Sequence, residues 1–582
     1  MSGGTPMIRK WGFFALGLAL ILAGSWLAHA IQTSGGVKVH DVRFAGDGGI
    51  TQSGLLYVPA TATARTPAPA VLASHGYINT REMQSAFAIE LARRGFVVLA
   101  MDMTGHGYSQ GSVGSHDFGG PAALRYLQSR PEVDRANIGL EGHSLGGGPV
   151  AAAAVVQPDG YRSLVLEGST LGILGAKAPA NPRNLAVVFG QYDEFAPLMW
   201  QIPKGSDVAK APRLMALFGT TRPVEEAKLY GSVPDGTARA LYNPPVTHPW
   251  EHFSKGGVAP AIHWFQRTLA GAANPLEPND QIWIWKEVGT GIAFVGFCFL
   301  LLGTFEVLLT VGPFRALNAP AQPLAERRGG RWWAAFLLTA IVPAATFFIF
   351  MKIGQVFFPM RLFPQWIQNQ LLVWGLLNAV ITLVLGFALR GGRPTFTHRW
   401  ALSAAIALVT VAIAYLSLVA VDAVWKVDYR FWVLGLKPLD GAHLLIIIPY
   451  LVLWSAFFLV AIRALAMNLA VRGEGFLWGV GAAKLAMCLG FIALLAIQYG
   501  ALFLTGLLAI PSEPLNTIVA IQFVPLLALV GAIGAFTYRR TNSYVPGALI
   551  CALVISWYVT AGTAIHWSPD FKLPPPGASR AK

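Results

Sequence analysis

The stretch NIGLEGHSLGGG, Asn137 to Gly148, places a serine between glycines directly after a short run of strand-forming residues. Ser144 stands in the pattern G-x-S-x-G, and a run of small residues that favours a helix follows it. This order of strand, glycine-flanked serine and helix predicts a sharp turn that presents the serine side chain at the edge of a sheet. The stretch therefore predicts alternating strands and helices, with Ser144 as a nucleophile.

The composition of the chain changes abruptly near residue 280. Over all 582 residues, 54% are hydrophobic and 12% are charged, about half the charged share of an ordinary soluble protein. Up to about residue 280 the chain mixes short strands, polar loops and helices, whereas apolar blocks of bilayer-spanning length follow from Trp283. We therefore predict four segments. They are an N-terminal signal anchor or signal peptide (1–31), an α/β domain (32–275), a transmembrane domain of about eight helices (283–567) and a polar, disordered tail (568–582).

The apolar blocks and the basic residues between them predict the orientation in the membrane. The spans are expected at roughly 287–311, 332–351, 368–389, 400–420, 442–462, 475–498, 515–537 and 544–566. Every second loop is rich in arginine, and Arg9 and Lys10 precede the first apolar run. Because basic loops stay in the cytoplasm, we expect a multi-pass protein of the cell membrane whose soluble domain is extracytoplasmic.

The net charge and the N-terminal run each favour one interpretation over another. The net charge of +14 does not predict nucleic-acid binding, because many of the basic residues lie in loops between apolar blocks. The N-terminal run is long for a cleaved signal, which favours a retained anchor over cleavage after Ala28-His29-Ala30.

The soluble segment alternates strands and helices. Five β-rich runs end at glycine or a polar residue: AVLASHG, FVVLAMD, NIGLEGH, SLVLEGS and LAVVFGQ. Helical segments separate them, and VKVHDVRF and GLLYVPA precede them as an expected antiparallel pair. Near-continuous apolar strands alternating with helices predict an α/β fold, a mostly parallel sheet with helices on both faces. Ligands bind such sheets at the carboxyl ends of the strands.

Residues 37–270 resemble the α/β-hydrolase superfamily, specifically its dienelactone-hydrolase and serine-peptidase-like esterase branches. The resemblance is carried by G-x-S-x-G, by SHGY after the third strand and by DMTGHGYS after the next one. It implies that the backbone N–H groups of Tyr77 and Leu145 form an oxyanion hole. It also implies that Asp102 and His106 form a turn and take no part in catalysis.

A serine nucleophile needs a base that is oriented by an acid, and in this superfamily the chain order is Ser, acid, His. The resemblance places the acid at Asp193, with Glu194 or Glu167 as alternatives. It places the base at His248, with His252 as the alternative. His263 is expected to be a core or surface residue. The insertion at 197–219 is expected to cover Ser144, to rest on the membrane or to be purely structural.

The sequence thus predicts a membrane-anchored serine hydrolase that acts on a small-molecule or lipid ester through an acyl-enzyme. The alternatives are an acyltransferase or a peptidase with the same triad, and a transporter or sensor with a non-catalytic hydrolase-like domain. No cofactor and no metal are expected, since the histidines lack acids or cysteines at ligand spacing.

Overall fold

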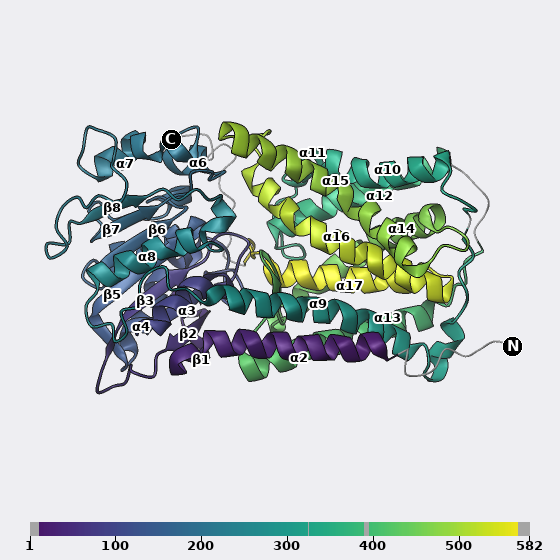
Figure 1. Ribbon diagram of the computed structural model, residues 1–582, viewed down its shortest axis with the longest axis horizontal. Helices are drawn as coiled ribbons and strands as arrows, with labels where there is room; N and C mark the ends of the chain where they lie inside the picture. The colour runs from purple at the N-terminus through teal and green to yellow at the C-terminus, as the bar shows by residue number, and fades with distance from the viewer. Residues whose placement is uncertain (1–10, 324, 389–394, 569–582) are drawn as a thin grey trace.

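The structure is a computed structural model that describes residues 11–323, 325–388 and 395–568 (Figure 1). The tail predicted at 568–582 lies outside the described residues except for Ser568, and so do Arg9, Lys10, Arg390 and Arg393. A part that contains a large sheet occupies one end of the molecule, and a bundle of long helices forms the rest (Figure 1).

Eight strands form one sheet in the order β1-β2-β4-β3-β5-β6-β7-β8. The strands are β1 (Lys38–Ala45), β2 (Thr51–Val58), β3 (Ala68–Ser74), β4 (Val97–Asp102), β5 (Val133–His143), β6 (Ser163–Glu167), β7 (Leu185–Val188) and β8 (Arg239–Tyr242). β1 pairs antiparallel with β2, and β2 with β4, while all other neighbours are parallel. The prediction of a mostly parallel sheet preceded by an antiparallel pair is confirmed.

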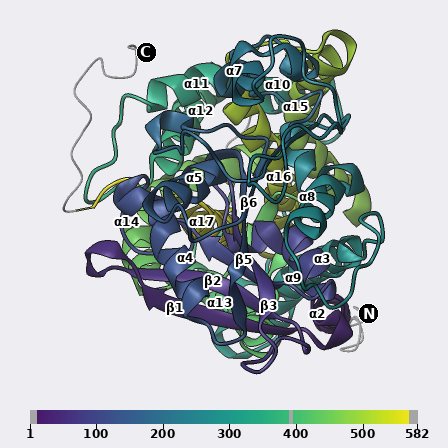
Figure 2. The ribbon, with the colours of Figure 1, turned by 90° about the vertical axis from the view of Figure 1, so that its left-hand side faces the viewer.

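Helices cover both faces of this sheet because successive residues of each strand point to opposite sides. On β3, Leu72 packs into the core beneath α4 (Gly120–Ser129) and α5 (Gly147–Val156). Val71 packs beneath α3 (Ser85–Arg93) and α8 (Lys255–Thr268). Seen from this end of the molecule, the two helix pairs flank the sheet on opposite sides (Figure 2).

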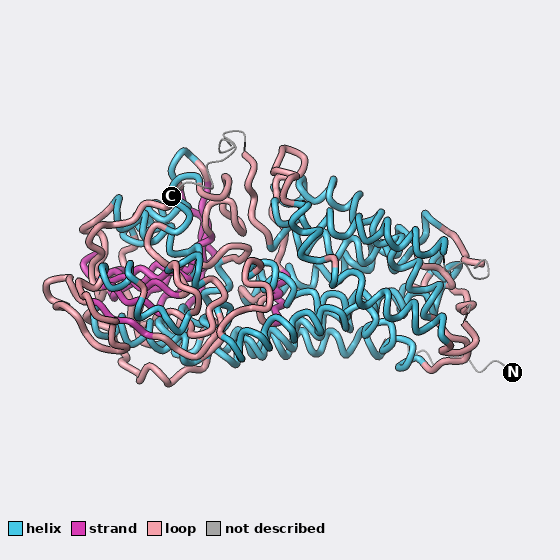
Figure 3. The backbone as a smooth tube through the Cα atoms, turned by 90° about the horizontal axis from the view of Figure 1, so that it is seen from above, coloured by secondary structure: helices cyan, strands magenta, loops and turns pink. Residues whose placement is uncertain are grey.

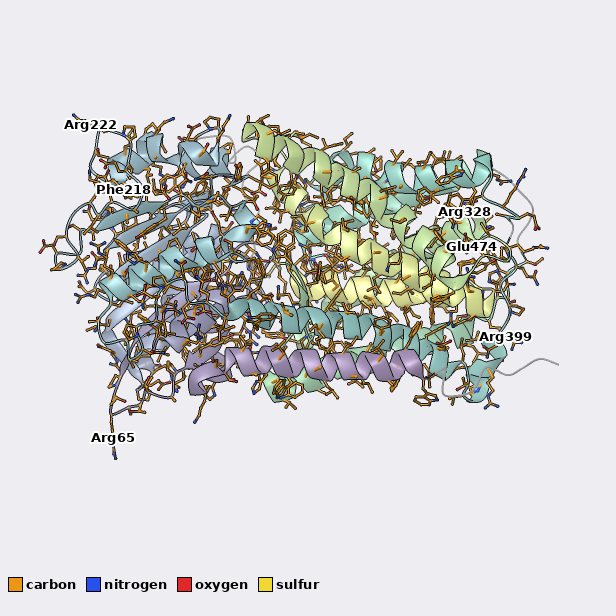
Figure 4. All side chains as sticks on the ribbon, viewed as in Figure 1. Arg65, Phe218, Arg222, Arg328, Arg399 and Glu474 are labelled. Atoms are coloured by element: carbon orange, nitrogen blue, oxygen red, sulfur yellow. The ribbon has the colours of Figure 1, made fainter. Side chains whose placement is uncertain are left out.

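The insertion between β7 and β8 packs onto the same domain. It contains α6 (Ala196–Trp200) and α7 (Pro212–Leu217), and Trp200, Val208 and Leu214 are buried in the core of the sheet domain. Phe218 and Arg222, at the tip of the insertion, lie at the end of the molecule away from the helical bundle (Figure 4). The tip therefore does not rest on the membrane part, while α6 lies nearer to it (Figure 1).

Ten helices form the bundle within the described residues. They are α2 (Gly12–Gln32), α9 (Trp283–Leu308), α10 (Gly330–Ala345), α11 (Phe347–Gly354), α12 (Trp366–Ala388), α13 (Trp400–Trp425), α14 (Gly441–Leu469), α15 (Phe476–Thr505), α16 (Pro514–Thr541) and α17 (Val545–Gly562). By length and composition, eight helices are able to cross a membrane, or nine if α10 and α11 together form one span. This architecture indicates a multi-pass membrane protein.

The span expected at 332–351 is broken, because α10 and α11 meet at an angle of 47°. Pro343 lies inside α10, where it lacks the N–H that would continue the backbone ladder. Thr346, at the break, donates its hydroxyl hydrogen bond to the carbonyl of Val342 (2.8 Å). A proline followed by a hydroxyl that bonds back to the helix accounts for the bend.

Helix α2 packs along α9, and both helices lead into the sheet domain (Figure 1). Their backbones touch at glycines: a Cβ on Gly24 would lie 2.5 Å from the carbonyl oxygen of Gly289, and a Cβ on Gly296 would lie 2.8 Å from that of Gly17. Small residues at such positions allow close helix packing in membranes. The N-terminal helix is therefore an integral part of the bundle in this structure.

The two parts of the molecule meet end to end. The strands of the sheet lie at one end, the long helices at the other, and the short hairpin of β9 (Tyr429–Phe431) and β10 (Leu434–Leu436) lies between them (Figure 3). Arg328 and Arg399 lie at the end of the bundle that is farthest from the sheet (Figure 4).

Candidate active site

Ser144 occupies the sharp turn that the sequence predicted. β5 ends at His143, a single short turn follows, and α5 begins at Gly147. The φ of Ser144 is +55°, in the left-handed region that non-glycine residues rarely adopt. A Cβ on Gly142 would lie 2.3 Å from the carbonyl oxygen of Gly146, so no larger residue fits there. This strained strand–turn–helix geometry is that of a nucleophile elbow.

Asp193 and His248 are hydrogen-bonded to each other. Asp193 lies beyond the end of β7, His248 begins the turn after β8, and Nδ1 of His248 lies 2.8 Å from Oδ2 of Asp193. Both side chains are buried. A carboxylate on Nδ1 fixes the ring and leaves Nε2 as the proton acceptor, which is the arrangement of a general base with its orienting acid.

The loop after β6 contacts both Ser144 and His248. A Cβ on Gly168 would lie 2.9 Å from Nδ1 of His248, and the hydroxyl of the next residue, Ser169, donates to the carbonyl of Ser144 (2.6 Å). The ring of His143 also lies 4.6 Å from that of His248, centroid to centroid. Ser144, Asp193 and His248 therefore gather at one edge of the sheet, although they are far apart in the sequence.

Charges beside His248 determine its protonation. Burial disfavours the imidazolium, but the carboxylates of Asp193 and Glu194 outweigh burial and raise the pKa of His248 above its ordinary value. Glu194 accepts a hydrogen bond from the backbone N–H of His248 (2.8 Å). Burial and the nearby Asp193 raise the pKa of Glu194 to about 7. Glu194 thus holds the backbone of the histidine, while Asp193 holds its ring.

The remaining histidines and the alternative acid Glu167 do not form the hydrogen bond that joins Asp193 and His248. His252 is buried, its ring lies 3.5 Å from that of His143, and its Nδ1 has no hydrogen-bond partner among the described residues. Both carboxylate oxygens of Glu167 also lack a partner within the described chain. His263 is exposed on α8. The geometry favours Asp193 and His248 over these alternatives.

Glu251 is a buried member of the site that the sequence did not single out. Its Oε2 lies 3.1 Å from Nε2 of His143 and 3.8 Å from Nδ1 of His248, and its Oε1 accepts from the N–H of Gly190 (2.8 Å). Burial and the charge of Asp193 raise the pKa of Glu251 well above its usual range. A neutral Glu251 does not compete with the charged Asp193 for the histidine.

One atom each of His143, His248 and Glu251 lies within 4.8 Å of the other two, a spacing that would suit a metal ion. The sequence spacing gave no sign of this group, because only His248 and Glu251 are close along the chain. Nδ1 of His248 lies 3.8 Å from Oε2 of Glu251, and the same nitrogen already bonds to Asp193 at 2.8 Å. Oε2 of Glu251 lies 3.1 Å from Nε2 of His143, whereas Nδ1 of His143 has no hydrogen-bond partner among the described residues.

The loop after β3 lies against the nucleophile. A Cβ on Gly76 would lie 3.0 Å from Cβ of Ser144, so the adjoining Tyr77 is close to the elbow. His75 bonds within the loop, with Nδ1 2.8 Å from the carbonyl of Gly76, and its Nε2 accepts from the N–H of Met103 (3.2 Å). Leu145 directly follows the nucleophile in the same turn. This placement agrees with the predicted oxyanion hole of Tyr77 and Leu145, which remains a prediction.

Hydrogen bonds to Asp102 hold the loop after β4, which agrees with the turn that the resemblance implies. Asp102 accepts hydrogen bonds from the N–H groups of Arg81 (2.9 Å) and Tyr108 (3.1 Å). His106 is buried, and its ring lies 5.2 Å from that of His75. Asp102 ties two loops of the domain together.

The helical bundle contributes to the surroundings of the site. Tyr499 of α15 donates its hydroxyl hydrogen bond to Glu194 (2.9 Å), and the hydroxyl of Tyr77 lies 2.8 Å from Nε2 of His566, which follows α17. Neither residue was singled out from the sequence. Both lie more than 300 positions from their partners, and no local pattern predicts a contact over that distance.

The sheet, the elbow and the Asp193–His248 pair define the N-terminal part of the chain as an α/β-hydrolase domain. Residues 65–201 match the family model described as serine aminopeptidase, S33. A monoacylglycerol lipase of Mycolicibacterium smegmatis is 28% identical over 210 residues, which cover 34% of this chain and 68% of that protein. These matches identify a domain of the serine hydrolase family, similar to lipases and esterases.

Solved structures with which the chain aligns include two hydrolases. An esterase from Pyrococcus furiosus is 17% identical, and the alignment covers 40% of this chain and 92% of that one with a TM-score of 0.30. A dienelactone hydrolase from Anabaena variabilis is 18% identical over 40% of this chain and 99% of its own, with a TM-score of 0.28.

Proposed function

We propose that the protein is a membrane-bound carboxylic-ester hydrolase that acts through Ser144, His248 and Asp193. The observation that carries this proposal is the strained elbow at Ser144, combined with the 2.8 Å bond between His248 and Asp193 at the same edge of the sheet. The similarity to a monoacylglycerol lipase favours an ester as the substrate.

The geometry supports a two-step reaction. Oγ of Ser144 attacks the ester carbonyl carbon while Nε2 of His248 takes the hydroxyl proton. The C–O bond then breaks, the alcohol leaves with that proton, and the acyl group stays on Ser144. Water attacks the acyl-enzyme and gives a proton to His248, after which the acid leaves and Ser144 regains its proton. The N–H groups of Tyr77 and Leu145 stabilise each oxyanion, and each donor contributes about 3 kcal/mol in related sites.

Hydrolysis of a peptide is the second candidate, favoured by the description of the matching family as a serine aminopeptidase. The same acyl-enzyme would form, with an amine as the leaving group. Turnover of aminoacyl p-nitroanilides, compared with that of p-nitrophenyl esters, separates the two. A kcat/KM at least tenfold higher on the anilides would make the protein a peptidase.

We further propose that the hydrolase domain is extracytoplasmic and that α2 is retained as an anchor. The arginine-bearing loops lie at the end of the bundle away from the hydrolase domain, as Arg328 and Arg399 show (Figure 4). Basic loops remain in the cytoplasm, which puts the hydrolase domain on the other side. The close glycine contacts between α2 and α9 support retention, since cleavage would expose a lipid-facing groove on α9.

A membrane-impermeant fluorophosphonate probe tests the chemistry and the orientation together. We expect it to label the wild-type protein on intact cells and not to label the Ser144→Ala variant. Labelling only after permeabilisation would overturn the orientation. Equal labelling of the two proteins, or labelling of neither in permeabilised cells, would overturn the assignment of the nucleophile.

A further inference from the structure

The catalytic edge of the sheet faces the helical bundle. The loops that follow four strands at this edge all contact it. The contacting pairs are Tyr77 with His566, Tyr108 with Pro438, Glu194 with Tyr499, and Trp250 with Trp432. The catalytic edge therefore lies at the junction between the two parts of the molecule.

Helix α15 contacts the loop that carries Asp193 and Glu194. Tyr499 bonds to Glu194, and Phe503, one turn further on, packs edge-on against Tyr192 at 5.2 Å. On the same loop, the ring of Phe195 lies 4.7 Å from that of His248. Aromatic side chains of this one loop thus contact both the end of α15 and the catalytic histidine.

The depth of this contact matches the position of lipid ester groups. Helix α15 has 30 residues, which corresponds to a length of about 45 Å, whereas the hydrocarbon core of a bilayer is about 30 Å thick. Centred on the bilayer, the helix extends about 7 Å beyond the core at each end. Tyr499 lies six residues before the end at Thr505, about 9 Å, so it lies at the boundary between acyl chains and headgroups.

The end of α15 also exposes apolar side chains beside the hydrolase domain. Phe503 is 55% exposed, Leu504 is 86% exposed, and Leu198 of the neighbouring α6 is 53% exposed. Gly506 lies against the aliphatic part of Lys204, just after α6, which puts the two helix ends next to each other. Exposed apolar side chains grouped at one place mark contact with lipid or an apolar ligand.

We propose that α15 forms a wall of the active site, along which an ester lipid passes from the bilayer to Ser144. The acyl chain lies against the apolar end of α15, and the ester group reaches the serine near Phe195 and His248. The inference rests on the proposed hydrolase function and adds to it the substrate class, long-chain lipids in the membrane.

The test compares two substrates on the purified full-length protein in phosphatidylcholine nanodiscs. One substrate is 1-oleoylglycerol incorporated in the nanodisc, and the other is water-soluble p-nitrophenyl acetate. The variant is Leu504→Asp, which puts a charge on the proposed path. The matched control is Leu445→Asp, because Leu445 is 73% exposed and lies four residues inside the end of α14 that faces the hydrolase domain.

We expect Leu504→Asp to lower turnover of 1-oleoylglycerol at least tenfold and to leave acetate hydrolysis within twofold of wild type. Leu445→Asp is expected to leave both activities within twofold. Retained acetate hydrolysis also shows that each variant is folded. If Leu504→Asp keeps its full turnover of 1-oleoylglycerol, or if its turnover of both substrates falls equally, the proposed path along α15 is wrong.

The result for the wild-type protein distinguishes a failure of the lipid path from a failure of the proposed hydrolase function on which it rests. A wild type that cleaves acetate and not 1-oleoylglycerol overturns the lipid substrate and leaves the hydrolase standing. A wild type that cleaves neither substrate and resists the fluorophosphonate probe overturns the proposed function itself.

Discussion

The hydrolase domain and the helical bundle both depend on glycine, but for different reasons. In the elbow, Gly142 and Gly146 let one chain turn sharply enough to hold Ser144 at a φ of +55°. Between α2 and α9, Gly24 and Gly296 let two separate helices approach backbone to backbone. In the elbow, glycine permits a strained backbone at a reactive residue. Between the helices, glycine permits close packing in a membrane, where the hydrophobic effect does not drive helices together. The same residue type thus serves chemistry in one part and assembly in the other.

The largest expected effect separates the two acids beside His248. We expect Asp193→Asn to lower kcat on p-nitrophenyl acetate by about 10³–10⁴-fold, because the ring then loses the carboxylate that orients it and stabilises its charge. Glu194→Gln is expected to lower kcat by less than tenfold, since Glu194 bonds to the backbone N–H of His248, whereas Asp193 bonds to the ring. Equal losses in the two variants would contradict the assignment of Asp193.

The next effect concerns the packing of the bundle. Gly24→Leu forces side-chain atoms into the backbone of α9, where even a Cβ would lie 2.5 Å from the carbonyl oxygen of Gly289. We expect a loss of about 3 kcal/mol in stability, measured as a lower midpoint of thermal unfolding in detergent. Gly12→Leu is the matched control, because nothing lies within 4 Å of a Cβ at Gly12. Equal midpoints for the two variants would show that the contact between α2 and α9 does not form.

A smaller effect is expected from the hydrogen bond between the helical bundle and the hydrolase domain. Tyr499→Phe removes the hydroxyl that donates to Glu194 and keeps the ring beside Phe503. We expect kcat on p-nitrophenyl acetate to fall about threefold to tenfold, the equivalent of one ordinary hydrogen bond of about 1 kcal/mol. An unchanged rate would show that this hydrogen bond from the bundle does not affect catalysis. If the effect is transmitted through Glu194, the Tyr499→Phe change has no further effect in a Glu194→Gln background.

The smallest effect is a shift of the pH profile. The charge of Glu194 raises the pKa of His248, and the base works only when it is neutral. Glu194→Gln removes that charge and lowers the pKa of His248, so the acidic limb of kcat/KM should move to lower pH. A limb that stays in place or moves to higher pH would contradict this electrostatic coupling.

The sequence predicted the fold of the hydrolase domain well because its signals are local. Strand-forming runs that end at glycine, the G-x-S-x-G turn and the helix after it each depend on residues that are neighbours in the chain. The apolar blocks predicted long helices for the same reason. The single span expected at 332–351 is a bent pair in the structure, because Pro343 breaks a segment that hydrophobicity alone makes continuous.

The site was predicted in part. Asp193 and His248 were expected from the chain order that the resemblance implies, and the structure brings them to 2.8 Å from each other. Glu251 was missed, although it lies three positions after His248, because nothing in a loop sequence tells a buried carboxyl from an exposed one. Tyr499 and His566 were missed because their contacts depend on how the bundle docks against the hydrolase domain.

The sequence by itself determined the elements, their order and the residues with the right chemistry, because backbone conformation and hydrophobic patterning act over a few residues. Only the tertiary structure decided that the catalytic edge faces the bundle, that α2 packs into it and that Tyr499 reaches Glu194. Those contacts join segments hundreds of residues apart, and they depend on the shape complementarity of whole surfaces rather than on any local pattern.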